Sequence, residues 1–477
     1  MAKQVTKKMA GHADHTKDAG NARGLPGKTD RRIKVLMLGA GSAFTPRLMN
    51  DVLNIPGLPG GEIALVDIDE ARLSLMDKVV KKLIRQLGKT GWTVSSSIDR
   101  RQVMKGADYI VNCIEVSGVG CVRFDNDIPL KYGLSQCIGD TIGPGGIFKG
   151  LRTIPSWLAI LKDAERYCPD ALVLNYTNPM SMMCTAAARA SSMRVVGLCH
   201  SVQGSSHGLA KWFGVPYEEV NWECAGINHL AWFLKFEHQG KDLYPAMIEK
   251  ATREIEAHAG DWSEVKDLVR KDMMIHFGAY ITESSGHLSE YLPYYRKRAD
   301  LMKKYCGPKY EGQESFYADE WPGWRVAADE QRKKWLSGEE SMGWERSWEY
   351  ASWIMEAHLK DAPFRIHGNV PNIQDGSDAL IPNILHSGVV EVPVFIDRRG
   401  FNPVRVGNLP QAMAAICDSN VRVFDLAADP AVHKSIELTV QAMLLDPLCA
   451  AVLSPGEIRK MTLDMFKAEK KFLPGYK

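Results

Sequence analysis

The side chains best suited to metal chemistry lie between positions 199 and 229. Cys199 and His200 follow an apolar run at 193–198, and Asn228 and His229 come shortly afterwards. A thiolate with an imidazole suits zinc best, and two protein ligands leave coordination positions that substrate oxygens can fill. The residue types are therefore compatible with an open metal site at Cys199 and His229, and equally with a core cysteine and a core histidine that bind no metal.

A second chemical signal is a glycine turn near the start of the chain. The apolar run at 33–38 ends in Gly39-Ala40-Gly41-Ser42, and Pro46 then suits the first turn of a helix. Such a turn lets the backbone approach a pyrophosphate at a helix N-terminus. Phe44 stands where the usual fingerprint has its third glycine. The alternative is a glycine turn in an α/β protein that binds no cofactor.

An acidic residue strengthens the nucleotide hypothesis. Asp67 follows a second apolar run, where a carboxylate hydrogen-bonds the adenosine ribose of NAD and repels the 2′-phosphate of NADP. We therefore expect NAD, with contacts from seven residues: Gly39, Gly41, Ser42, Phe44, Thr45, Asp67 and Asn175.

Polar residues for a substrate come at further loop positions. Asn175 and Asn178 lie at the end of another apolar run, and Asp140 lies in a glycine-rich loop that Arg152 follows. Open parallel sheets bind ligands at the carboxyl ends of their strands. Amide, carboxylate, imidazole and guanidinium groups around one pocket suit a polyhydroxylated ligand. The predicted substrate contacts are Asp140, Asn178, His200, Asn228 and Arg152.

The elements that must position these residues alternate in the first half of the chain. Apolar runs separated by helical stretches predict a doubly wound, mostly parallel α/β sheet of the Rossmann type. The runs lie at 33–38, 63–66, 109–114, 171–175 and 193–198. After residue 200 the alternation fades into an α+β pattern. There we expect extended structure at 222–236, helices at 340–359, 409–417, 435–445 and 455–469, and a solvated, partly helical insertion at 320–350.

Length and composition predict three parts. A chain of 477 residues exceeds the usual size of one core. We expect a disordered extension at 1–32, an NAD-binding Rossmann domain at 33–200, and an α+β domain at 201–477 for substrate, metal and oligomerisation. A net charge of +2 argues against nucleic-acid or anionic-membrane partners. Ten cysteines without a secretory signal or a membrane span indicate reduced thiols in the cytoplasm.

Six motifs occur in the order found in glycoside hydrolase family 4, which the chain resembles from about residue 33 to its end. They are Gly39-Ala40-Gly41-Ser42 with Thr45-Pro46, and the segments 140–146, 175–179, 197–203, 226–229 and 283–285. The resemblance implies NAD⁺ and a divalent metal, commonly Mn²⁺, with Cys199 and His229 as metal ligands. It also implies a lactate/malate dehydrogenase-like fold and a homodimer or homotetramer.

The mechanism implied by this resemblance is redox-assisted elimination, outside the two-carboxylate scheme of most glycosidases. NAD⁺ takes hydride from C3, a base removes the C2 proton, the C1 leaving group departs, water adds, and the ketone is reduced again. His287, Asp272 and Tyr291 are the candidates for the base. A neutral imidazole makes His287 the best local choice. A hydroxyl contact is its alternative role.

The substrate implied by the resemblance carries no phosphate. Relatives that act on 6-phosphorylated sugars generally have an acidic or amide residue after the metal-binding cysteine, whereas this chain has His200. His200 is a candidate leaving-group acid or a contact to that group. We rank α-galactoside and α-galacturonide close together and α-glucoside third. A uronate would favour a nearby cation, for which Arg152, Arg296 and Lys297 are available.

Two functions from other classes remain as alternatives. An NAD-dependent dehydrogenase of lactate or malate type has a similar nucleotide domain but needs no metal, so the Cys199 and His229 pair argues against it. A non-catalytic sugar or nucleotide sensor would bind its ligand without turnover.

Overall fold

The computed structural model describes residues 24–477 except 259 and 375. Six parallel strands form one end of its sheet, and they confirm the predicted Rossmann-type alternation. In spatial order they are β3 (Trp92–Ser97), β2 (Gly61–Val66), β1 (Ile33–Leu38), β4 (Tyr109–Asn112), β5 (Leu172–Asn175) and β6 (Arg194–Gly197). The five apolar runs became strands. The sixth strand, β3, was missed because it is a mostly polar edge strand with one fully buried residue.

Helices connect these parallel strands, as right-handed crossovers require. They are α2 (Thr45–Leu53), α3 (Glu70–Gln86), α4 (Val119–Lys131), α5 (Gly143–Tyr167) and α6 (Met180–Ala190), with the 3₁₀ turn η2 (Arg100–Gln102) before β4; α7 (Ser201–Phe213) follows β6 and leads into the second half. Pro46 stands in the first turn of α2, where a missing N–H costs no hydrogen bond. The glycine turn therefore leads directly into a helix N-terminus, as predicted.

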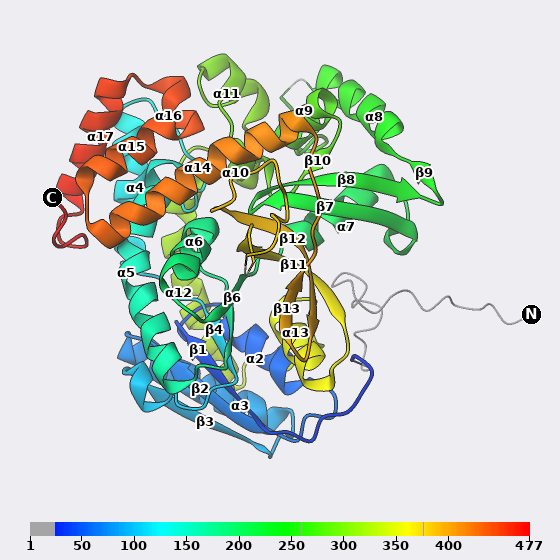
Figure 1. The fold of residues 1–477 in the computed structure, drawn as a ribbon, viewed down its shortest axis with the longest axis vertical. Helices are drawn as coiled ribbons and strands as arrows, with labels where there is room; N and C mark the ends of the chain where they lie inside the picture. Colours follow the sequence, from blue (N-terminus) through cyan, green and yellow to red (C-terminus); the bar gives the residue numbers. More distant parts are fainter. Residues whose placement is uncertain (1–23, 259, 375) are drawn as a thin grey trace, which may run out of the picture.

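The second half extends the same sheet with antiparallel strands. From β6 outward they are β11 (Phe364–Pro371), β12 (Val389–Asp397), β7 (Val220–Ile227), β8 (Leu230–His238) and β10 (Tyr280–Ile281), with β13 (Gly400–Pro403) beside β12 and β9 (Lys241–Asp242) beside β8. The predicted extended segment at 222–236 is the β7–β8 hairpin. Figure 1 shows the blue strands of the first half and this green hairpin at opposite ends of the molecule.

Two single-residue pairings connect the parallel end of the sheet to the β7–β8 hairpin. Asn369 of β11 pairs with Gly197 of β6, and Glu391 of β12 pairs with Gly226 of β7. One continuous apolar core contains residues of both halves. The junction therefore fixes the end of β6, where Cys199 follows, relative to the β7–β8 turn. The division at residue 200 into two domains stays a prediction.

Most of the remaining helices belong to the second half. They are α8 (Tyr244–Ala257), α9 (Leu268–Phe277), α10 (Ser285–Leu288), α11 (Ala299–Tyr305), α12 (Phe316–Ser337), α13 (Tyr350–Lys360), α14 (Gln411–His433), α15 (Ile436–Leu445), α16 (Pro447–Val452) and α17 (Pro455–Ala468), with the 3₁₀ turns η3 (Tyr217–Glu219) and η4 (Lys309–Glu311). Among the described helices, none combines the length and apolar composition needed to cross a membrane.

Two of the four predicted helices match closely and two needed correction. The helices at 435–445 and 455–469 are α15 and α17, whereas the helix expected at 409–417 continues to His433 as α14, which crosses the molecule in Figure 1. The helix expected at 340–359 begins only at Tyr350. The N–H groups of Trp344 and Ser347 are bound by the side chains of Asn50 and Asp51. Tertiary hydrogen bonds therefore replace helical ones there.

The expected solvated insertion at 320–350 is attached to the first half of the chain. Most of it forms α12, where Asp329 pairs with Arg72 of α3 at 2.8 Å. Arg332, which is 2 % exposed, donates to the carbonyl oxygen of Gly41 at 2.9 Å. The segment is thus partly helical and largely exposed, as expected, and it also buttresses the glycine turn.

The predicted disordered extension is wrong for its last residues. Leu25 is buried and donates its N–H to Glu356 of α13 at 2.8 Å, while Lys360 donates to the Leu25 carbonyl at 3.1 Å. Residues 24–32 are therefore part of the fold. The rest of the predicted extension, 1–23, lies outside the described residues.

Candidate active site

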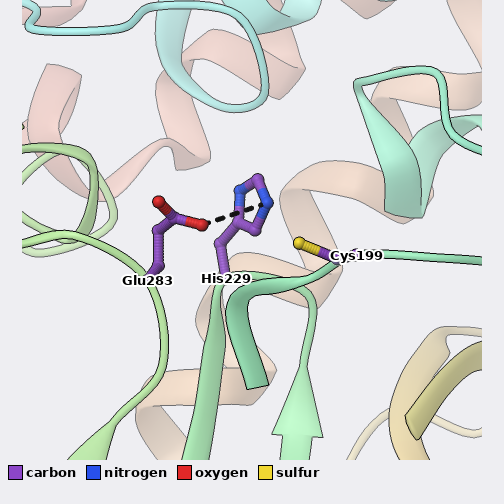
Figure 2. Close-up of side chains that lie close together, drawn as sticks. All are labelled: Cys199, His229 and Glu283. Atoms are coloured by element: carbon purple, nitrogen blue, oxygen red, sulfur yellow. Dashed lines mark ion pairs between the residues drawn. The ribbon is translucent and has the colours of Figure 1, made fainter. Parts of the chain in front are cut away.

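Three potential metal ligands converge where three segments of the chain leave the sheet. Cys199 follows β6, His229 lies in the β7–β8 turn, and Glu283 follows β10. One ligand atom from each lies within 4.8 Å of the others, and His229 Nε2 is 3.4 Å from Glu283 Oε2. Figure 2 shows all three side chains pointing toward one another. The structure thus brings Cys199 and His229 together and adds a carboxylate that the sequence analysis did not assign.

Backbone strain marks this group as well. His229 and Glu283 have φ angles of 63° and 75°, in the left-handed region that non-glycine residues rarely adopt. Such strain concentrates at functional sites, where the surrounding structure holds it in place. The β7–β8 turn and the segment after β10 therefore present an imidazole and a carboxylate at some conformational cost.

Burial favours the neutral forms of the two predicted ligands. It raises the pKa of the Cys199 thiol and lowers the pKa of His229 to about 4. For Glu283 burial acts to raise the pKa, but His229 and His287 outweigh it and hold the pKa well below the usual range. A neutral imidazole and an ionised carboxylate are the forms that bind a metal ion, whereas the Cys199 thiol must lose its proton to do so.

His229 is oriented by a tyrosine. The Tyr291 hydroxyl lies 3.4 Å from His229 Nδ1, and the Tyr291 side chain is fully buried. Metal-binding histidines commonly engage their second nitrogen in this way, which fixes the ring. The contact leaves Nε2 directed at Glu283. Tyr291, one of the three candidates for the C2 base, therefore has a positioning contact here.

Asp140 forms the second polar group of the site. Its carboxylate accepts hydrogen bonds from Asn178 at 3.4 Å and from Lys149 at 3.3 Å, and Lys149 also pairs with Glu115 at 3.0 Å. Burial acts to raise the Asp140 pKa, but Lys149 and His287 outweigh it and bring the pKa to about 2. Asp140 and Asn178 are thus together as predicted. Lys149 was missed because periodicity on α5 does not show which helix face meets the site.

His287 connects this carboxylate with the metal candidates. Its ring centroid is 4.7 Å from that of His229, and its Nε2 lies 3.9 Å from Asp140 and 3.8 Å from Glu290. Burial lowers the pKa of His287, but Glu283, Glu290 and Asp140 outweigh it and raise the pKa to about 9. Nε2 makes no hydrogen bond to any described residue. It is therefore available to a ligand.

Two buried amides lie unpaired close to the predicted ligands. Both side-chain polar atoms of Asn228, beside His229, lack a hydrogen-bond partner in the described chain, and the same holds for Gln203 on α7. Both side chains are fully buried. Leaving such an atom unsatisfied costs about 1–3 kcal/mol, so a ligand that bonds these amides would be favoured. Gln203 belongs to the 199–203 motif, but no role was predicted for it.

The glycine turn has the geometry of a phosphate-binding loop. Gly39 has φ 70°, and a Cβ there would lie 2.3 Å from the Cys113 carbonyl oxygen, so only glycine fits. A Cβ on Gly41 would lie 2.9 Å from Asp67 Oδ2, and the Gly41 N–H donates to that oxygen at 2.7 Å. The predicted carboxylate thus lies directly beside the predicted turn.

The other predicted nucleotide contacts differ in their availability. Phe44 is 42 % exposed, Ser42 accepts the Phe44 N–H at 3.2 Å, and the buried Thr45 hydroxyl has no partner among the described residues. Asn175 is buried; its Oδ1 accepts from Asn112 at 2.8 Å and its Nδ2 donates to Thr177 at 3.1 Å. Asn175 therefore supports the loop that carries Asn178.

His200 lies between the two predicted sites. It is exposed, its ring centroid is 6.5 Å from that of Phe44, and its Nδ1 is 3.8 Å from Glu349. It directly follows Cys199 at the N-terminal end of α7. His200 is thus accessible beside the metal candidates, as a leaving-group contact requires.

Two predicted site residues are not brought to this group. Arg152 is buried on α5, where it pairs with Asp125 at 2.6 Å and also with Glu469. Asp272 accepts hydrogen bonds from Tyr295 at 2.8 Å and Tyr305 at 3.1 Å. These contacts replace the substrate contact expected of Arg152 and the base role considered for Asp272.

Comparisons with known proteins show which family the chain matches. Residues 34–215 match the sequence profile of the family 4 glycosyl hydrolases, and residues 224–449 match that of their C-terminal domain. An α-galactosidase of Bacillus subtilis (strain 168) is 38% identical over 453 residues, covering 93% of this chain and 100% of the relative. An α-galactosidase of Rhizobium meliloti (strain 1021) is 36% identical over 450 residues, covering 93% and 89%.

A solved structure shows the same fold. The 6-phospho-α-glucosidase from gut microorganisms, in complex with NAD and Mn²⁺, superposes with a TM-score of 0.77 at 21% identity, covering 94% of this chain and 100% of that one. The predicted Rossmann-type architecture with a second α+β part is thereby confirmed. Because the two profiles span most of the chain, this protein belongs to the family 4 glycosyl hydrolases.

Proposed function

We propose that this protein is an α-galactosidase that acts on unphosphorylated substrates and requires NAD and a divalent metal ion, Mn²⁺ being the first candidate. The observation that carries the proposal is the convergence of Cys199, His229 and Glu283 beside Asp140. The relatives named as α-galactosidases, at 38% and 36% identity, support the choice of sugar.

The donor set fits a divalent transition metal. Cys199, His229 and Glu283 offer sulfur, nitrogen and oxygen within one small volume, and the unpaired Asn228 amide lies beside them. Sulfur and nitrogen suit zinc, whereas carboxylate and amide oxygens also suit Mn²⁺. Three protein ligands leave positions that sugar hydroxyls can complete. In this proposal Cys199, His229 and Glu283 hold the ion.

The glycine turn fits a dinucleotide. Gly39 and Gly41 leave open the space that a Cβ would fill, the turn leads into α2, and Asp67 stands where a ribose hydroxyl needs an acceptor. Asp67 carries a negative charge that repels a 2′-phosphate, which favours NAD over NADP. The accessible Phe44 ring and the unpaired Thr45 hydroxyl provide further contacts.

When bound, the nicotinamide supplies reversible hydride transfer at C3, and the metal supplies Lewis-acid polarisation of the adjacent oxygen. The side chains of Asp140, Asn178 and Asn228 bind and orient the sugar hydroxyls. His287 moves the C2 proton through its unpaired Nε2. The negative charge of Glu283 contributes to the high pKa of His287. A cation held by Glu283 would offset this charge and lower the pKa of His287 toward neutral pH. His200 contacts the leaving group.

The cations near the site favour a neutral sugar over a uronate. Lys149 is engaged by Asp140 and Glu115, and Arg152 by Asp125 and Glu469. Arg296 donates to Ser135 at 2.8 Å and to Gly312 at 3.0 Å, and Lys297 is exposed. Arg152 and Arg296, which were suggested for a sugar carboxylate, are thus buried and paired with protein groups. The same holds for Lys149 beside Asp140. This arrangement supports α-galactoside over α-galacturonide.

The assembly and the compartment follow as further proposals. A homodimer or homotetramer is expected from the family resemblance. All ten cysteines are unpaired, and one of them is the proposed metal ligand Cys199, which supports a reducing compartment such as the cytoplasm.

The test is cleavage of aryl α-galactoside, α-galacturonide and α-glucoside by the reduced protein, with NAD⁺ and Mn²⁺ each supplied or omitted. We expect release of the aglycone from the galactoside only when both are present, without accumulation of NADH. Steady NADH formation without aglycone release would support the dehydrogenase alternative. Absence of both signals, with retained NAD binding, would leave a binding protein.

Replacing His287 with alanine tests its role in moving the C2 proton. We expect exchange of the C2 hydrogen with solvent deuterium to fall by about 100-fold or more, because general acid–base groups contribute on this scale. Substrate affinity should change far less. His287→Gln, which keeps a hydrogen-bond donor without a basic nitrogen, should bind substrate normally but exchange as slowly as the alanine variant. Exchange that persists in both variants would limit His287 to a hydroxyl contact.

A further inference from the structure

Two exposed aromatic rings lie next to each other on η4 and α12. Tyr310 is 49 % exposed and Trp324 is 37 % exposed. Their ring centroids are 6.4 Å apart and their planes are inclined by only 16°. Phe316, which is buried, packs against both rings at 4.7 Å and 5.7 Å. We call Tyr310 and Trp324 the aromatic platform. Exposed apolar side chains that adjoin one another, in contrast to single ones, are a feature of ligand surfaces.

One side of the platform adjoins the helix that carries His287. A Cβ on Gly286 of α10 would lie 2.6 Å from the Tyr310 carbonyl oxygen, so the two backbones are in direct contact. The charges of Glu283 and Asp140 also act on Tyr310: after burial, Glu283 is the largest cause that raises the Tyr310 pKa. Tyr310 is therefore a neighbour of the proposed catalytic group.

The other side of the platform is attached to the loop that carries Asp140. Ser315 donates its N–H to Gln136 at 2.7 Å, and Tyr317 donates to Cys137 at 3.0 Å. The Tyr317 ring in turn packs against Trp324 with centroids 6.0 Å apart. The position of the platform is thus coupled through the backbone to the position of Asp140.

Charged groups lie at the inner edge of this aromatic cluster. Lys149 Nζ is 5.9 Å from the centroid of the Trp321 ring and 3.3 Å from Asp140 Oδ2, and Arg325 is also 5.9 Å from Trp321. Trp321 stacks on Tyr317, which packs against Trp324. Aromatic faces next to fixed charges suit a ligand with apolar C–H faces and many hydroxyls, and not a purely apolar one.

We propose that Tyr310 and Trp324 form a binding subsite for the leaving-group sugar of an oligosaccharide α-galactoside. The proposal rests on the α-galactosidase function proposed above, because it places the galactosyl ring beside Asp140 and His287. The next sugar ring would then stack its C–H face on the platform, while Arg325, beside Trp321, would face its hydroxyls. Binding energy from such a remote ring serves to position the reacting bond.

Comparing substrates with and without a second ring tests the subsite. In the double variant Tyr310→Ala/Trp324→Ala, kcat/KM for a galactosyl-hexose disaccharide should fall by about tenfold, because each aromatic contact is worth a few-fold. For methyl α-galactoside it should change by less than about twofold. Trp324→Phe should keep most of the disaccharide activity. Val326→Ala, on α12 and 58 % exposed, is the matched control and should match the wild type.

A binding measurement separates this proposal from the proposed function. Saturation-transfer NMR with free glucose, a hexose lacking the galactosyl group, should detect contact with the wild type and with Val326→Ala, and the signal should drop in the double variant. An unchanged signal in the double variant would overturn the subsite. The subsite would also be overturned if the double variant lost activity equally on the disaccharide and on methyl α-galactoside and its sedimentation coefficient changed. That result would assign the platform to contact with a second copy of the chain. If the wild type cleaves no galactoside but shows the variant-dependent glucose signal, only the proposed function fails.

Discussion

Replacing Cys199 with serine is expected to lower kcat by about 100-fold or more and to weaken Mn²⁺ binding to a similar degree, because a hydroxyl replaces a soft thiolate ligand. NAD affinity should remain at the wild-type level, since the glycine turn follows β1 and Asp67 follows β2, away from Cys199 after β6. His229 and Glu283 would remain as a two-ligand site 3.4 Å apart. Metal titration of the activity and direct NAD binding measure the two effects separately.

The matched control for this change is Cys224→Ser. Cys224 is a buried free cysteine on β7, the strand that leads to His229, but it is not one of the three converging side chains. Its variant should retain the metal dependence of the wild type. Cys199→Ser with unchanged metal dependence would remove Cys199 from the metal site and leave His229 and Glu283 to be explained in another way.

Replacing Arg152 with leucine is expected to lower the free energy of unfolding by about 3–5 kcal/mol, because it leaves buried carboxylates without their cation. The Arg152 and Glu469 side chains are 2% and 0% exposed, and Asp125 is 6% exposed. Burial and then Asp125 raise the pKa of Glu469 to about 9, so this group keeps its proton at neutral pH. The negative charge of Asp125 would then face the leucine side chain instead of a cation.

Urea denaturation of the full-length protein measures this loss. Adding Asp125→Asn to Arg152→Leu should recover part of the stability, since it removes the uncompensated charge. Arg253→Leu is a suitable control: Arg253 pairs with Glu249 at 2.6 Å, but both side chains are about two-thirds exposed. That change should cost less than about 1 kcal/mol. Equal losses for Arg152→Leu and Arg253→Leu would contradict a structural role for the buried network.

The sequence by itself determined the local signals of this protein. The five apolar runs, the glycine turn with Pro46 and the carboxylate at Asp67 all depend on contacts that are close in the chain or on the fixed geometry of a βαβ unit. The motifs around Cys199 and His229 were equally readable, because each follows the end of a strand. These features predicted both the fold and the family.

Tertiary structure decided which distant residues meet, because neither periodicity nor motif spacing encodes distance across a sheet. Glu283 joins Cys199 and His229 only because β10 and the β7–β8 hairpin extend the Rossmann sheet. Arg152 looked available in the sequence, but the buried side chains of Asp125 and Glu469 engage it in a structural network. Lys149, one helical turn earlier on α5, instead meets Asp140. Side chains one turn apart can thus have different partners, since other segments of the chain determine what packs beside each.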